Sequence, residues 1–364
     1  MSASSAPAKP SLVGADLAAL QASLQAAGVP EKQLKLRAKQ LFHMLYFRGV
    51  ADFGGMTTLP AALRSALDAQ FDIARPAITT AQISEDGTRK WLLRFPDGKE
   101  VESVFIPETD RGALCVSSQV GCSLTCSFCH TGTMPMVRNL KPGEILAQMM
   151  VARDALDEWP GGVENRLFTN IVMMGMGEPL LNYDNMVQAL RIAMADDGLN
   201  LSKRRITVST SGIVPKIDQL GEDLPVGLAI SLHAVNDELR NELVPINQKW
   251  GIEELLAACA RYPARRQITF EYVMLKGVND SDAEARELVR LLAPLPAKVN
   301  LIPFNPWPGA PFECSSNNRI RAFAKIVEAG GFASPVRTPR GRDIFAACGQ
   351  LKTASEKSRR LRAA

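Results

Sequence analysis

Apolar and polar positions follow a helical period in the first fifth of the chain. Between residues 14 and 75 the sequence is typical of helices, and within EKQLKLRAKQLFHMLYFRG the apolar positions recur every three or four residues. These positions are Leu34, Ala38, Leu41 and Leu45. The basic residues Lys32, Lys35 and Lys39 occupy a different stripe. The pattern predicts a helical accessory domain over residues 13–80 with one basic side.

The period then changes to that of strands. The runs KWLLRF and EVESVFIP are joined by Pro-Asp-Gly-Lys, which predicts a β-hairpin within residues 88–107. Glu102 shares a strand face with Val104 and Ile106. A carboxylate on an apolar face is costly when ionised, so we expect a raised pKa for Glu102. A glutamate on an edge strand that points to solvent is the alternative that the pattern leaves open.

From residue 108 onward, strand and helix patterns alternate. The strand candidates are ALCVSS, TNIVMM, RITVST, VGLAIS, ITFEYVM and KVNLIPF. The helix candidates are GEILAQMMVARDAL, NMVQALRIAMA, IEELLAACARY, AEARELVRLLA and NRIRAFAKIVEA. Six such units of apolar strands predict an α/β fold, a partial (β/α)6 TIM-like barrel over residues 108–342. Sites in such folds lie on loops at the carboxyl ends of the strands.

A cluster of thiols lies at one of these strand ends. In GCSLTCSFCHTG, directly after the first predicted strand, Cys122, Cys126 and Cys129 have the spacing C-x3-C-x2-C. Three thiolates can hold three irons of a 4Fe–4S cube and leave the fourth iron open. Zinc needs a fourth ligand. His130 is poorly placed beside Cys129, and Cys115 lies on the preceding strand, so the spacing favours iron–sulfur over zinc.

Composition and charge narrow the protein class. A chain of 364 residues with seven cysteines, an odd number partly in one tight cluster, is typical of a reducing compartment rather than a secreted disulfide scaffold. The N-terminus lacks the pattern of a signal peptide, and no segment reaches the ~20 apolar residues of a membrane span. We therefore expect a cytoplasmic protein with no membrane partner, and a monomer.

Basic residues gather at both ends of the chain, although the net charge is only +4. Besides the three N-terminal lysines, the last part of the chain holds Arg337, Arg340 and Arg342. Two basic clusters around a redox-active middle favour an RNA partner over two solvated faces. Residues 1–12 are predicted to be a disordered tail. Residues 343–364 are predicted to form a C-terminal extension with a basic tail.

The cysteine spacing resembles that of the radical S-adenosylmethionine (SAM) enzymes. The resemblance implies that the open iron binds the amino and carboxylate groups of SAM, which is then cleaved to a 5′-deoxyadenosyl radical. MGMGEP, after the second predicted strand, resembles the glycine-rich SAM motif of that superfamily. There Gly177 lets the backbone approach the ligand closely, and Glu178 offers a carboxylate to the ammonium group.

The resemblance is closer to one family and covers almost the whole chain. The motifs that carry it are RAKQLFHMLYFRG, VESVFIPE, GCSLTCSFCHTG, MGMGEPLLN, STSGIVP, SLHA, IPFNPWPGAPF and RTPRGRDIFAACGQL. They are similar to the dual-specificity methyltransferases that modify C2 of adenine in 23S ribosomal RNA and transfer RNA. This carbon is electron-poor and cannot attack the methyl group of SAM, which explains the need for a radical.

The resemblance also implies a role for single residues. Cys348 takes a methyl group from a first SAM, since a thiolate is a competent nucleophile. The radical from a second SAM removes hydrogen from that group, and the resulting methylene adds to the adenine, linking enzyme and RNA covalently. Glu102 is the base that removes the C2 proton. Cys115 forms a disulfide with Cys348 and releases the RNA.

The same family implies a binding pocket and partners. The SAM contacts would be Gly177, Glu178, Ser209, Ser231, Leu232, His233, Asn305 and Phe128, the last packing on the adenine of SAM. The partners would be 23S ribosomal RNA, transfer RNA, an electron donor of the flavodoxin type and a thiol reductant. Without the resemblance, Cys115, Cys348 and His233 would each be assigned to the protein core or to a satisfied polar contact, as Cys259 and Cys314 are.

Three other functions stay open at this point. The sister family that methylates C8 of adenine shares nearly every catalytic residue, although the similarity through the N-terminal domain favours C2. A zinc-stabilised RNA-binding protein without catalysis would explain the thiols and the basic clusters. A radical SAM enzyme that acts on a small molecule would explain the thiols and the glycine motif.

Overall fold

A computed structural model of the chain describes residues 9–109, 111–160, 166–263 and 267–352. Nine strands form one sheet in the order β1-β2-β3-β4-β7-β8-β9-β10-β11. Their bounds are β1 Ala77–Ile83, β2 Arg89–Arg94, β3 Glu100–Pro107, β4 Gly112–Cys115, β7 Asn170–Met173, β8 Ile206–Thr210, β9 Gly227–Ser231, β10 Ile268–Met274 and β11 Ala297–Pro303. A separate pair joins β5 (Gln119–Val120) to β6 (Arg138–Asn139).

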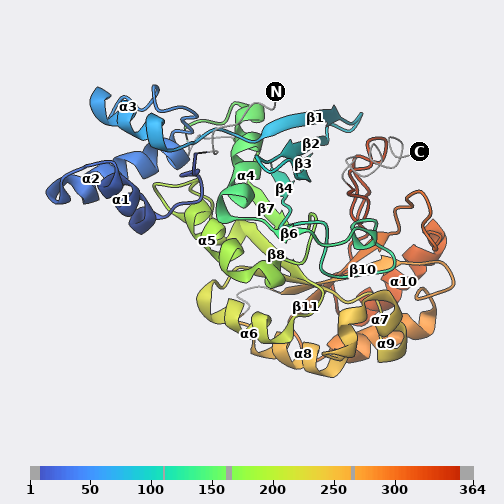
Figure 1. Cartoon of the computed structure of the whole chain (residues 1–364). Helices are drawn as coiled ribbons and strands as arrows, with labels where there is room; N and C mark the ends of the chain where they lie inside the picture. The colour runs from blue at the N-terminus through green and yellow to red at the C-terminus, as the bar shows by residue number, and fades with distance from the viewer. Residues whose placement is uncertain (1–8, 110, 161–165, 264–266, 353–364) are drawn as a thin grey trace.

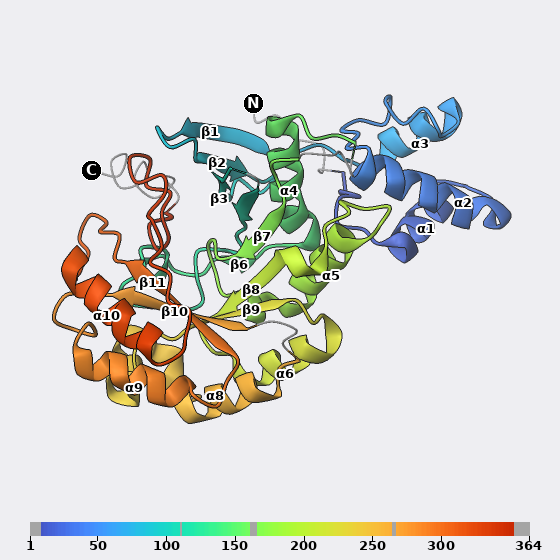
Figure 2. The same cartoon turned by 180° about the vertical axis from the view of Figure 1, so that it is seen from behind.

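The six strands from β4 to β11 are parallel and form an open barrel. Each pairs with the next in register, and among the described residues β4 and β11 do not pair with each other. Helices cover the outside of this curved sheet (Figures 1 and 2). They are α4 Pro142–Leu156, α5 Tyr183–Met194, α6 Val214–Asp223, α7 Asp237–Leu243, α8 Ile252–Arg261, α9 Asp282–Leu292 and α10 Asn317–Ala329.

This architecture confirms the predicted partial barrel. All six predicted strands and all five predicted helices overlap observed elements, because long apolar runs on strands buried on both faces give a strong signal. The helices α6 and α7 were not predicted. Both are short, and α6 begins with Pro215 within its first turn, where the sequence suggests a loop end as much as a helix start.

The predicted hairpin is present and continues into the barrel sheet. The strands β2 and β3 pair antiparallel, and the turn between them has Gly98 at a φ of 76°. Because β3 also pairs with β4, Glu102 lies on an interior strand and is 6% exposed. The alternative of an edge-strand glutamate facing solvent is therefore wrong.

The sequence did not predict β1. Residues 77–80, expected in the helical domain, instead begin a strand that pairs with β2 at the edge of the sheet. Every residue of β1 is exposed, so no alternation of apolar and polar positions marked it. Backbone pairing, rather than side-chain burial, holds this strand in place.

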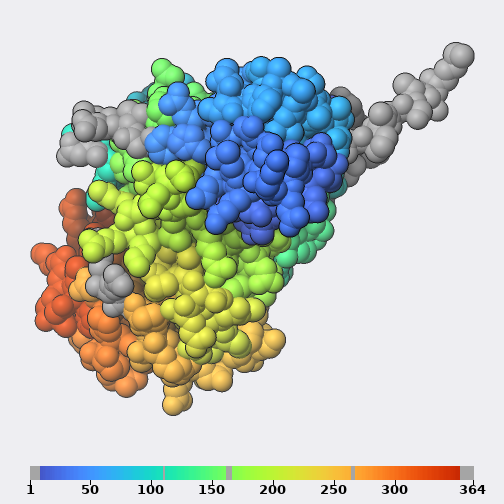
Figure 3. All heavy atoms as spheres, turned by 90° about the vertical axis from the view of Figure 1, so that its left-hand side faces the viewer, coloured from blue at the N-terminus to red at the C-terminus, as the bar shows by residue number. Residues whose placement is uncertain are grey.

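The helical domain forms from α1 (Leu17–Ala26), α2 (Glu31–Phe42), the short π-helix His43–Phe47 and α3 (Ala61–Gln70). The four apolar positions noted in the sequence are all buried, so the helical period was read correctly. Figure 3 shows the domain packed against the side of the barrel. Gln188 on α5 donates to the Gly14 carbonyl at 2.8 Å, and Arg75 pairs with Asp154 on α4 at 2.8 Å.

The predicted N-terminal tail is shorter than expected. Residues 1–8 lie outside the described residues, but residues 9–12 are part of the fold. Ser11 forms a bridge with Asp72, and Leu12 is 3% exposed. One buried leucine next to serine and proline forms no periodic pattern, so the sequence gave no sign that these residues are ordered.

The chain after α10 returns to the barrel. Val336 forms a parallel bridge with Leu301 of β11, and residues 340–352 then reach the hairpin and the cysteine loop. Residues 353–364 of the predicted extension lie outside the described residues. No helix within the described residues is long and apolar enough to cross a membrane.

Candidate active site

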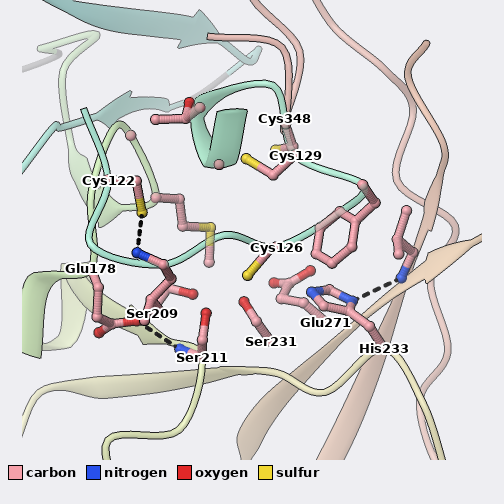
Figure 4. A pocket seen from close by; sticks show the side chains of 18 of the residues that line it. Cys122, Cys126, Cys129, Glu178, Ser209, Ser211, Ser231, His233, Glu271 and Cys348 are labelled. Atoms are coloured by element: carbon pink, nitrogen blue, oxygen red, sulfur yellow. Dashed lines mark hydrogen bonds between the residues drawn. The ribbon is translucent and has the colours of Figure 1, made fainter. Parts of the chain in front are cut away.

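A cavity opens at the carboxyl ends of the parallel strands, where the barrel fold predicts a site. It encloses about 1020 Å³, solvent at its mouth included. Segments far apart in the sequence line it: the cysteine loop, the glycine motif after β7, the ends of β8 to β11 and the C-terminal segment. Figure 4 shows the labelled side chains of this cavity, with three cysteines of the loop and Cys348 facing the same space.

The loop after β5 brings the three predicted cysteines to the cavity. Cys122, Cys126 and Cys129 all line it. Its entry requires Gly121, which has a φ of 78° and sits so close to Pro135 that a Cβ would lie 2.1 Å from the proline carbonyl oxygen. The loop is thus shaped by a glycine as well as by its thiols.

The environment of these thiols suits a positively charged ligand. Burial raises the pKa of Cys122 to about 12 and raises the pKa of Cys126 and Cys129 as well. Neighbouring thiols raise the pKa of Cys126 further through charge repulsion. Such thiols stay protonated at neutral pH unless a metal supplies the compensating charge.

The donor set fits an iron–sulfur cube. Within the described residues, no group of three or more His, Cys, Asp or Glu side chains is arranged to hold a metal ion. A cube has one cysteine on each ligated iron, so its thiolates stand apart around the cluster instead of converging on one ion. Cys122, Cys126 and Cys129 are the residues that would hold it, since all three line the cavity.

Glu178 follows Gly177 in the glycine motif and lines the cavity. It is 3% exposed, and its carboxylate accepts hydrogen bonds from the N–H groups of Leu180 at 3.0 Å and Ser211 at 2.8 Å. Burial raises its pKa to about 7, while these N–H donors oppose the rise. Gly177 has a φ of 96°, and a Cβ there would lie 2.5 Å from the Gln119 side chain. The position therefore requires glycine.

His233 and Phe128 form the aromatic part of the cavity. Their rings meet edge to face with centroids 4.5 Å apart. His233 Nδ1 accepts the N–H of Val273 at 3.1 Å, and burial lowers the pKa of the imidazole to about 3. His233 is thus neutral at physiological pH and holds Phe128 toward the cavity.

Most of the other predicted SAM contacts also line the cavity. Ser209, Ser231 and Asn305 lie at the ends of β8, β9 and β11. Leu232 does not line it: its side chain is fully buried, and its carbonyl accepts from Arg240 Nε at 3.0 Å. Leu232 in SLHA is a core residue at the end of β9. The sequence motif alone does not show which of its residues point into the cavity and which into the core.

Glu271 is a cavity residue that the sequence analysis missed. It lies within β10, is 3% exposed, and accepts the Asn300 amide at 2.9 Å with one carboxylate oxygen. The other oxygen, Oε2, is buried and has no hydrogen-bond partner among the described residues. Burial raises the pKa of this carboxyl, and Arg337 opposes the rise. A glutamate inside the apolar run ITFEYVM was the signal that could have revealed it.

Cys348 and Cys115 approach the site from different sides. Cys348 lines the cavity and is exposed to water there, whereas Cys115 on β4 is 8% exposed and does not line it. Both thiols are free. Partial burial of the thiol among the cavity atoms raises the pKa of Cys348, and the charge of Arg337 lowers it. Burial raises the pKa of Cys115, and the charge of Cys348 raises it further.

Glu102 lies beside the Cys348 segment rather than on the cavity wall. It pairs with Lys90 at 3.1 Å and accepts the backbone N–H of Lys352 at 2.8 Å. Burial raises its pKa, while Lys90 and the Lys352 N–H lower it. The expected upward shift is confirmed, with burial as its largest cause.

The predicted RNA-binding residues fall into two groups. Lys32, Lys35 and Lys39 are exposed on α2, so the basic stripe faces solvent. The arginines partly serve the fold: Arg340 donates to the Pro107 carbonyl at 2.9 Å, and Arg342 Nε donates to Asn305 at 3.4 Å. Arg337 is exposed, and its charge lowers the pKa of both Cys115 and Cys348.

Comparisons with known proteins identify the family of the chain. Residues 116–289 match the model of the Radical SAM superfamily. The "Dual-specificity RNA methyltransferase RlmN" of Chelativorans sp. is 59% identical over 97% of this chain and 90% of that protein. The protein of the same name from Novosphingobium aromaticivorans is 61% identical over 92% of this chain and 84% of its own length.

A solved structure extends the likeness to three dimensions. The crystal structure of a radical SAM methyltransferase from Sphaerobacter thermophilus superposes with a TM-score of 0.88 at 47% identity. It covers 94% of this chain and 99% of its own. With full-length relatives of this similarity, the chain belongs to the RlmN family of dual-specificity RNA methyltransferases, within the radical SAM superfamily.

Proposed function

We propose that this protein is a radical SAM enzyme that transfers a methyl group to C2 of adenine in 23S ribosomal RNA and transfer RNA. One observation carries the proposal: a single cavity collects the three loop cysteines, Glu178 of the glycine motif and the distant Cys348. Family membership adds the RNA substrate class, through the name that the relatives bear.

Each part of the cavity suits one group of the cofactors. Cys122, Cys126 and Cys129 would hold a 4Fe–4S cluster. Glu178 would accept the ammonium group of SAM, and Phe128 would pack on its adenine. When bound, the cluster and SAM supply a 5′-deoxyadenosyl radical. Glu271 offers its free carboxylate oxygen to a hydrogen-bond donor of the bound SAM, since an unpaired buried acceptor is costly.

Cys348 is the methyl carrier in this proposal. It lies on the cavity wall, where a methyl donor and the thiol can meet. The nearby Arg337 favours its thiolate, which is the nucleophilic form. The methylated sulfur then presents one carbon to the RNA base, and two molecules of SAM are used per turnover.

Glu102 and Cys115 complete the reaction. Glu102, whose pKa is raised by burial, would remove the proton at C2 of the covalent radical adduct. The unpaired electron of the adduct would pass to a one-electron acceptor, a role that the oxidised cluster could fill when bound. Cys115 then attacks the sulfur of Cys348, which forms an S–S bond and breaks the bond from sulfur to the RNA-bound carbon. That carbon takes up a proton and becomes the methyl group. A thiol reductant must restore both cysteines.

The RNA and the cell supply the remaining parts. The target adenine must leave its stack to reach the end of a barrel. Lys32, Lys35 and Lys39 would contact phosphates, since exposed lysines on one helix side track a backbone. We further propose a monomer in the cytoplasm, where an electron donor of the flavodoxin type and reducing thiols are present.

The experiment compares RNA from cells that lack this protein with RNA from cells that express it again. Digestion and mass spectrometry should show 2-methyladenosine in both RNA classes only when the protein is present. Methylation at C8 would instead identify the sister activity. Zinc without acid-labile sulfide in the anaerobically purified protein would favour the RNA-binding alternative and reject catalysis.

A further inference from the structure

Lys90 and Glu102 form a buried ion pair between β2 and β3. Lys90 Nζ lies 3.1 Å from Glu102 Oε1, and the two side chains are 10% and 7% exposed. Buried ion pairs add little stability relative to apolar pairs, and loss of one partner leaves a costly charge behind. Because Glu102 is the proposed catalytic base, this pair is better explained by a role in the reaction than by stability.

The same pair holds both ends of the segment that carries Cys348. Lys90 Nζ also donates to the Phe345 carbonyl at 3.3 Å, shortly before Cys348. The second oxygen of Glu102 accepts the N–H of Lys352 at 2.8 Å, shortly after it. Lys90 and Glu102 thus bind the segment by hydrogen bonds on either side of Cys348.

Uncharged contacts fix the middle of this segment. The Gly349 carbonyl accepts the N–H of His130 at 2.8 Å, and the Leu351 carbonyl accepts the Thr131 hydroxyl at 2.6 Å. The Cys348 carbonyl accepts the Asn305 amide at 3.2 Å. These bonds do not depend on the charge of Glu102, whereas the Lys90 pair does.

We propose that Lys90 is a positioning residue that holds the Glu102 carboxylate and the Cys348 segment in one arrangement, so that base and methyl-carrying thiol face the substrate together. This inference rests on the roles proposed above for Glu102 and Cys348. When Glu102 takes the C2 proton, the electron pair of the C–H bond stays with the RNA intermediate, and the unpaired electron left by radical addition passes to a one-electron acceptor. The carboxyl group is then neutral, Lys90 loses its charge partner, and the segment loosens for the reaction of Cys348 with Cys115.

The groups that face Glu102 define the pH behaviour. They are Lys90 from β2 and the N–H of Lys352 from the C-terminal segment. Lys90 lowers the pKa of Glu102 against the effect of burial. Removing Lys90 therefore raises this pKa, and the base is ionised only at higher pH.

The first test measures the segment without catalysis. Full-length protein with its cluster is purified anaerobically, and amide hydrogen exchange over residues 345–352 is followed with alkylation of Cys348. We expect K90M and E102Q each to raise both rates about tenfold or more, since a bond to a charged group is lost. K90R should stay near wild type, as should K99M in the turn of the same hairpin.

The second test separates positioning from a structural role. Release of methylated RNA from the enzyme is timed in single turnovers across pH. K90M should move the acid limb of this profile to higher pH, and K90R should restore it, whereas a merely structural defect would lower the rate equally at every pH. Wild-type exchange in both K90M and E102Q, or an acid limb that K90M does not move, would overturn the inference.

The two tests also separate this inference from the proposed function. If no variant and no wild-type protein methylates RNA, the proposed function fails, while hydrogen exchange still decides whether Lys90 holds the segment. If K90M does not fold, E102Q alone provides the exchange test, because glutamine keeps the shape but not the charge.

Discussion

The thiols of the cysteine loop and the pair Cys115–Cys348 are built in opposite ways. Cys122, Cys126 and Cys129 come from one short loop, and all three line the cavity. Cys115 lies on the first barrel strand and Cys348 near the end of the chain, so only the fold can bring them toward one another. When one loop supplies a group of site residues, the sequence shows them as a spacing motif. When several elements supply the residues, the sequence shows no such motif.

The difference extends to how each region can fail. The loop depends on its own glycine and on three cysteines, so a single substitution removes one of the proposed cluster ligands. The Cys348 segment depends on contacts from the hairpin, the cysteine loop and the loop after β11. Changes in these elements should therefore alter the position of the thiol without removing it.

The largest effect is expected in the loop. C126A should lose the cluster, measured as iron and acid-labile sulfide after anaerobic reconstitution, and with it all methylation, because only two thiols remain. C259A is the matched control, since Cys259 is buried in α8 outside the cavity. A full complement of iron and sulfide in C126A would contradict the assignment of this loop.

Substitutions of Cys115 or Cys348 should block the reaction at a step after cluster assembly. C115A should keep the cluster and accumulate a covalent protein–RNA species, visible as a shifted band that ribonuclease removes, because no thiol can displace the RNA. C348A should keep the cluster and give no such species, since it has no sulfur to methylate. Repeated turnover by C115A would refute the release step.

A smaller effect is expected at the assembled wall of the cavity. E271Q should weaken SAM binding about tenfold in equilibrium dialysis with the cluster-loaded protein, since a charged acceptor becomes neutral. E313Q, on an exposed ion pair, serves as the control. Unchanged affinity in E271Q would show that the free oxygen of Glu271 does not contact SAM.

The smallest effect is expected in the basic stripe, which one helix supplies locally but outside the cavity. Replacing Lys32, Lys35 and Lys39 together by alanine should leave the cluster intact. RNA affinity should fall several-fold, and the slope of log affinity against log salt should drop by about 0.7 to 0.9 for each lost phosphate contact. An unchanged salt slope would place the RNA elsewhere.

Much of the fold followed from the sequence because its signals are local. Apolar β-branched runs marked the parallel strands, and helical periods marked the helices between them. The fully exposed β1 and the short α6 carried weak signals and were missed. The expected raised pKa of Glu102 was also correct, since burial on an interior strand is its largest cause.

By itself the sequence determined the spacing of the three loop cysteines, the glycine motif and the strands and helices of the barrel, because each depends on residues close together in the chain. The tertiary structure alone decided that Glu271 keeps a free oxygen in the cavity, that Leu232 is core, and that Lys90 grips the Cys348 segment. These features depend on distances between side chains from separate elements. No spacing along one chain encodes such distances, because they arise from how the elements pack.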